Sequence, residues 1–130
     1  MDDSPLSKAK DYSIKIPREV IESALSAFMQ EAGLLRTSEA LYSIQTIETD
    51  GESWSLPNQD TFLSEYAKDI SSARLSLAWR TENKELAFAI SFRHDFSGNP
   101  STRIQLSLVS RAAIDRIFRH FQDFYDHEVL

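Results

Sequence analysis

Three stretches between residues 71 and 108 alternate strictly between apolar and polar positions. Successive side chains on a strand point to opposite faces, so each stretch gathers its bulky side chains on one face. These positions are Ala73, Leu75, Leu77 and Trp79 in the first stretch, Leu86, Phe88, Ile90 and Phe92 in the second, and Ile104, Leu106 and Leu108 in the third. The pattern predicts three antiparallel strands that share one apolar face.

A two-residue turn at residues 82–83 would fix the pairing of the first two strands. With this turn Trp79 faces Leu86 on the apolar face. On the other face Arg80 then lies opposite Glu85, which is a favourable pair of opposite charges. A shift of one residue would disturb both faces, so the sequence predicts a single register.

Apolar residues at helical spacing predict three helices. The first covers residues 18–32, between Pro17 and Gly33, which favour the beginning and the end of a helix. The second is short, with Asn58 or Asp60 as its cap, and reaches residue 68. The third covers residues 111–127 after Ser110 as its cap, and it carries the heaviest apolar stripe of the chain.

The remaining segments give shorter patterns. Residues 12–16 alternate and predict a short strand, whereas the polar residues 1–11 predict a mobile N-terminal tail. Residues 35–55 predict a hairpin closed by Asp50 and Gly51. Its first strand changes phase between Ile44 and Ile47, which indicates either a bulge or partial cover of both faces.

Together these elements predict a single α+β domain over residues 12–130. The expected order is β-α-β-β-α-β-β-β-α, with an antiparallel sheet of five or six strands. We expect the first and last helices to pack on the face that contains Trp79, Phe88 and Ile104.

Composition narrows the class of protein. The chain has 130 residues, of which 42% are hydrophobic, and its net charge is −6. An acidic chain repels polyanions on average, so nucleic acid is an unexpected partner. The absence of cysteine excludes disulfides, thiolate metal sites and a cysteine nucleophile. No apolar run is long enough for a membrane span or a signal peptide, so we expect a cytoplasmic protein.

Two groups of residues could carry chemistry, and neither predicts an enzyme. His120, Asp123 and His127 share one helix face at a spacing that could hold a metal, but the same spacing occurs on any solvated face. His94 and Asp95 are adjacent in the longest loop, where no nucleophile accompanies them. Because the usual nucleophile and phosphate-loop motifs are also missing, we expect no catalytic residue, no metal and no cofactor.

The second face of the three predicted strands has an unusual composition. It carries many small side chains, where a solvated sheet face usually carries longer polar ones. Small residues permit the close approach of a second layer, although a plain solvated face remains the alternative. The interface candidates on this face are Arg74, Ser76, Ala78, Ala87, Ala89, Ser91, Arg93, Arg103 and Gln105.

The leading hypothesis is therefore a non-enzymatic protein-interaction or oligomerisation module that uses the bare face or the edge of its sheet, with a second copy or another protein as partner. A homodimer is the expected form. The alternative is a sensor of an anionic metabolite or nucleotide. It would use residues 93–101 as a lid and Arg93, His94 and Arg103 as ligand contacts.

A third reading is an acidic chaperone or an immunity-type binding protein. The chain resembles the acidic α+β secretion chaperones in length and composition. Those chaperones have three strands before the middle helix and two after it, whereas two and three are predicted here. The sequence therefore identifies no family.

Overall fold

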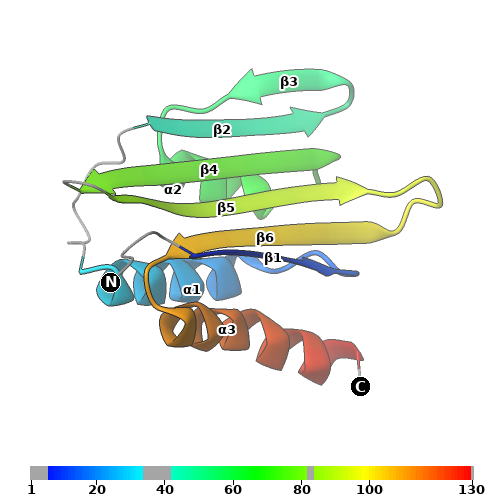
Figure 1. Ribbon diagram of the computed structural model, residues 1–130. Helices are drawn as coiled ribbons and strands as arrows, with labels where there is room; N and C mark the ends of the chain where they lie inside the picture. Colours follow the sequence, from blue (N-terminus) through cyan, green and yellow to red (C-terminus); the bar gives the residue numbers. More distant parts are fainter. Residues whose placement is uncertain (1–5, 34–41, 82–83, 130) are drawn as a thin grey trace.

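The computed structural model describes residues 6–33, 42–81 and 84–129. Within these ranges six strands and three helices alternate in the predicted order (Figure 1). In chain order the elements are β1 (Leu6–Tyr12), α1 (Arg18–Glu31), β2 (Tyr42–Thr49), β3 (Glu52–Ser55), α2 (Gln59–Tyr66), β4 (Ser72–Thr81), β5 (Lys84–His94), β6 (Pro100–Leu108) and α3 (Arg111–Val129). The α+β class is confirmed.

The six strands form one antiparallel sheet in the order β1-β6-β5-β4-β2-β3. The predicted register of β4 and β5 is confirmed, because Trp79 pairs with Leu86 and Arg80 pairs with Glu85. The expected turn at residues 82–83 lies outside the described residues. In the middle of the sheet, the apolar pairs on one face and the charged pair on the other are therefore formed in the same register.

The apolar face of the sheet packs against the helices. On α1, the ring centroid of Phe28 lies 5.3 Å from that of Trp79 and 5.6 Å from that of Phe88. On α3, Phe121 is fully buried. Burying an aromatic side chain of this size contributes about 1.5–3 kcal/mol, so each of these rings stabilises the packing of helices on the sheet.

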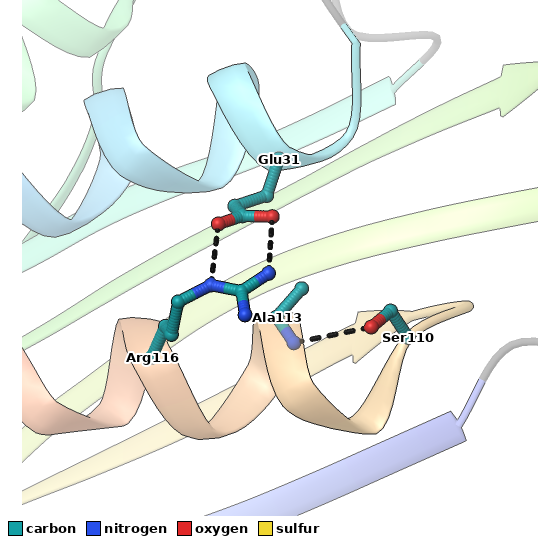
Figure 2. A network of polar contacts seen from close by, with 4 residues as sticks. All are labelled: Glu31, Ser110, Ala113 and Arg116. Carbon is teal, nitrogen blue, oxygen red and sulfur yellow. Dashed lines mark hydrogen bonds and ion pairs between the residues drawn. The ribbon is translucent and has the colours of Figure 1, made fainter.

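The second and third helices begin at the predicted caps. The side chain of Asn58 accepts a hydrogen bond of 2.8 Å from the backbone N–H of Thr61. The hydroxyl of Ser110 accepts one of 3.2 Å from the backbone N–H of Ala113 (Figure 2). Each cap satisfies a donor that has no partner inside the helix. Among the described residues, no helix combines the length and apolar character needed to cross a bilayer.

The prediction of a mobile tail is wrong for residues 6–11, which belong to β1. This strand pairs with β6 along its whole length, from Leu6 opposite Leu108 to Tyr12 opposite Thr102. The strand expected at residues 12–16 therefore lies earlier in the chain. Residues 1–5 are outside the described part.

The segment between β1 and α1 is fixed by buried hydrogen bonds. The hydroxyl of Thr102 donates to the carbonyl oxygen of Ile14 at 2.7 Å and accepts from the backbone N–H of Ile16 at 3.2 Å. The hydroxyl of Tyr66 donates to the carbonyl oxygen of Ile16 at 2.5 Å. These bonds satisfy backbone groups that enter the core without secondary structure of their own.

The hairpin of β2 and β3 turns at Asp50 and Gly51, both with positive φ (51° and 79°), as a two-residue turn requires. The change of phase in β2 does not come from a bulge, which was one of its two expected explanations. Pairing with β4 is unbroken from Tyr42 to Glu48, so no bulge interrupts this part of the strand. Gln45 takes the inward position and is buried, whereas Ile44 lies on the opposite face and is 43% exposed.

Candidate functional site

The bare face of the sheet is defined here as the side of β1, β6, β5, β4 and β2 on which no described helix packs. Paired residues form rows across it. One row runs Ser7, Ser107, Ala87, Ala78 and Tyr42; the next runs Ala9, Gln105, Ala89, Ser76 and Ile44; the third runs Asp11, Arg103, Ser91, Arg74 and Thr46. Every predicted interface candidate is on this face. Arg93 follows the third row on β5.

The small side chains of the bare face differ in their exposure. Ser76, Ala87 and Ala89 are half-buried, and Ser91 is exposed. Ala78 differs from the other candidates because it is only 1% exposed. It therefore offers no surface to a partner, although its position on the sheet is the predicted one.

Arginines surround this surface in unequal environments. Arg80 lies 3.4 Å from Glu85, and Arg103 lies 3.9 Å from Asp11. The side chains of Arg74 and Arg93 form no hydrogen bond or ion pair with any of the described residues. Positive charge at this end of the bare face is thus only partly balanced by the described residues.

Two hollows lie between the arginines. The first, called the arginine cavity here, has a volume of about 250 Å³ and is lined by Arg74, Leu75, Ser76, Ala89, Ile90, Ser91, Arg103 and Gln105. A neighbouring hollow of about 280 Å³ is lined by Asp11, Ser91, Arg93, Ser101 and Arg103. The two hollows share Ser91 and Arg103, so these two residues lie where the hollows adjoin.

The structure separates the three predicted ligand contacts. Arg93 and Arg103 line one hollow. His94 lies on the opposite face, where its ring packs edge-on against Phe92 at 5.2 Å and its Nδ1 lies 3.3 Å from the carbonyl oxygen of Ser71. The reason is the alternation of the strand, which places consecutive residues on opposite faces.

The expected lid is also much shorter than residues 93–101. β5 continues to His94 and β6 begins at Pro100, so only residues 95–99 form the connection. Asp95 closes it, because its carboxylate accepts the backbone N–H groups of Ser97 and Asn99 at 2.9 and 2.8 Å. This carboxylate is therefore engaged in the turn, and residues 95–99 line neither hollow.

The histidines of α3 are on its outer side. His120 is exposed, and its Nδ1 lies 3.4 Å from the hydroxyl of Ser23 on α1. Asp123 and His127 are exposed as well. In the described part of the chain, no group of three or more His, Cys, Asp or Glu residues has the arrangement of a metal site.

Sequence reasoning missed the contribution of β1 to the bare face. Asp11 lines the second hollow beside Arg103, and Ser7 and Ala9 extend the rows of small side chains. Their signal was present in the sequence, because Ser7 and Ala9 repeat the small-residue alternation of β5 and β6. It was not recognised because residues 1–11 lack the apolar positions that mark a strand.

Comparison with known proteins identifies no relative: no family model, no curated protein and no solved structure matches this chain.

Proposed function

We propose that this protein is a non-enzymatic binding module that docks an acidic segment of a protein partner on the bare face of its sheet. The observation that supports the proposal is the composition of that face: half-buried Ser and Ala side chains flanked by arginines, two of which have no acidic partner among the described residues. A cytoplasmic location is part of the proposal.

The charge distribution favours an acidic partner over a second copy. The chain as a whole has a net charge of −6, so two copies repel each other at long range. Stacking two bare faces about a twofold axis near Ser91 would also bring Arg74 and Arg103 close to the same residues of the second copy. An acidic segment feels the same net repulsion at long range, but it avoids the contact between arginines, because its charge is opposite to that of Arg74 and Arg93.

The small side chains of the bare face allow a bound segment to approach the sheet closely. Ala87 and Ala89 place only methyl groups above the backbone of β5, so an extended chain can lie near the sheet. Alanine has little intrinsic preference for strands. Its presence at these positions therefore favours the access of a partner to the sheet rather than the stability of the strand.

The test is a titration with a short peptide rich in Glu and Asp, in which the NMR chemical shifts of the protein's backbone amides are measured. We expect shifts to move on β4, β5 and β6, and binding to weaken at least about tenfold in Ala87→Glu, which adds bulk and like charge at the centre of the face. Ser64→Glu is the matched control, because Ser64 is exposed on α2 and the variant has the same net charge.

The results of these experiments distinguish an acidic partner from a second copy of the chain. Equal weakening in both variants would show that only net charge matters, and the proposal would fail. Sedimentation of the wild-type protein and of Ala87→Glu tests the second copy. A dimer that dissociates in Ala87→Glu would replace the acidic partner by self-association.

A further inference from the structure

We infer that the arginine cavity binds a phosphoryl dianion, carried either by a phosphorylated side chain of the partner or by a free phosphomonoester. The inference rests on the proposed function in one respect, since it names the chemical group that the bare face would recognise. It requires no other part of the docking surface, so the two can be tested separately.

The position of the arginines is the first argument. Arg74 on β4 and Arg103 on β6 lie in the same row, with Ser91 of β5 between them. Neighbouring strands are about 4.8 Å apart, so the two backbone positions are separated by about 10 Å. Both side chains line one hollow, so an anion above Ser91 would have a guanidinium on each side.

The number of charges is the second argument. A carboxylate carries a single charge and is satisfied by one bidentate arginine. A phosphomonoester carries about −1.5 to −2 at neutral pH and has three acceptor oxygens, so it can accept from two guanidinium groups at once. The arginine cavity has two such groups, and Arg93 of the adjoining hollow adds further positive potential.

The floor of the cavity supplies space and neutral donors. Ala89 and the two serines are short, and they leave a hollow of about 250 Å³ that longer side chains would fill. The hydroxyls of Ser76 and Ser91 and the amide of Gln105 can donate to an oxyanion. The Gln105 amide is held weakly, at 3.4 Å from the hydroxyl of Ser7, and is available to turn toward a ligand.

Asp11 competes for this charge. Its carboxylate lies 3.9 Å from Arg103, and the two side chains are 63% and 61% exposed. An ion pair so long and so exposed contributes little in water, so it does not neutralise Arg103. The carboxylate of Asp11 would nevertheless repel a dianion bound beside Arg103. Removing this carboxylate should strengthen the binding of a dianion, which gives a test that does not depend on loss of function.

The experiment is isothermal titration with O-phosphoserine, and with acetate as the monoanion for comparison. We expect O-phosphoserine to bind and acetate not to bind in the same range. Binding should weaken at least about tenfold in Arg74→Gln and in Arg103→Gln, because each removes a charged donor. It should tighten in Asp11→Asn. Arg119→Gln is the control, since Arg119 is exposed on α3 and the variant has the same net charge.

A peptide that carries one phosphoserine, with its unphosphorylated form, distinguishes the two sources. A phosphopeptide that binds more tightly than O-phosphoserine assigns the dianion to a partner protein, whereas equal affinities assign it to a free phosphomonoester. The inference is overturned if O-phosphoserine does not bind, or if Arg119→Gln weakens it as much as Arg74→Gln. In that case, loss of acidic-peptide binding in Ala87→Glu would still support the docking surface.

Discussion

Arg116 of α3 donates two parallel hydrogen bonds to the carboxylate of Glu31 at the end of α1, at 2.8 and 2.9 Å (Figure 2). These hydrogen bonds are the main reason why the pKa of Glu31 lies below its ordinary value and the pKa of Arg116 above its own. The pair joins the last turn of one helix to the first half of the other. It therefore aligns the two helices that cover the sheet.

The first prediction concerns this pair and pH. Because the pKa of Glu31 is lowered on folding, the stabilisation is present above the ordinary carboxyl pKa and is lost as the pH falls through the lower, folded-state value. Glu31→Gln should be less stable than the wild type at pH 7, and the difference should vanish in acid. Urea unfolding at pH 7 and below pH 4 measures it. A difference that persists in acid would contradict the charged pair as the cause.

The second prediction compares two buried tyrosines. The hydroxyl of Tyr66 donates to Ile16, whereas that of Tyr12 has no hydrogen-bond partner among the described residues. Tyr66→Phe should cost about 1–3 kcal/mol because it leaves a buried carbonyl without its donor. Tyr12→Phe should be neutral or stabilising, since it removes a hydroxyl that satisfies nothing. Chemical denaturation of both variants would reveal a reversed order if these assignments were wrong.

The third prediction concerns the effect of Tyr12 on the stability of the protein at alkaline pH. Burial, and then the charge of Asp126, raise the pKa of Tyr12 from 10.0 to about 12. A raised folded-state pKa means stabilisation that is complete below pH 10 and lost as the pH rises toward 12. The stability of the wild type should fall more steeply than that of Tyr12→Phe over this interval. Parallel slopes in alkaline unfolding curves would refute the shift.

The fourth prediction uses one substitution at two sites. Phe28 is fully buried between α1 and the sheet, whereas Phe96 is fully exposed at the turn between β5 and β6. Phe28→Ala should cost about 3–5 kcal/mol through lost burial and the cavity left behind. Phe96→Ala should change stability by less than about 0.5 kcal/mol. Thermal unfolding distinguishes them, and similar losses at both sites would count against the core described here.

The register in the middle of the sheet was predictable because two separate patterns, one on each face, determine it. In β4 and β5 the apolar face fixes which residues point inward, and the pair of Arg80 and Glu85 agrees with the same alignment on the other face. Either signal alone would permit a shifted register. Their agreement is what made the pairing readable from the sequence.

β1 was not predictable from apolar periodicity, because lysines occupy its inward positions. Lys8 lies over the ring of Phe118 at 5.2 Å and forms an ion pair of 3.2 Å with Asp115. Lys10 lies over the ring of Tyr12 at 5.4 Å. Their aliphatic stems cover α3 as apolar residues would, while their charged ends stay in water. A strand at the edge of a sheet can therefore look like a polar tail.

The candidate site was predicted in part for a similar reason. Alternation along β4, β5 and β6 placed Arg74, Arg93 and Arg103 on one face, and the same alternation, applied strictly, excludes His94 from it. The hollow above Ser91 was not predictable, since it depends on how side chains from neighbouring strands lean. Its acidic neighbour Asp11 required β1 to be recognised first.

The pairing of β1 with β6 also determines the order in which the sheet can be completed. During synthesis β1 emerges before the other described elements, but its partner, from Thr102 to Leu108, belongs to the last of the described strands. Until then the β1 segment has no neighbour in the sheet, and once β6 has joined β5 the free edge of β6 presents open backbone groups. A nascent chain thus closes this sheet by bringing the first of the described strands onto the last, and premature encounters between chains would take place at that edge.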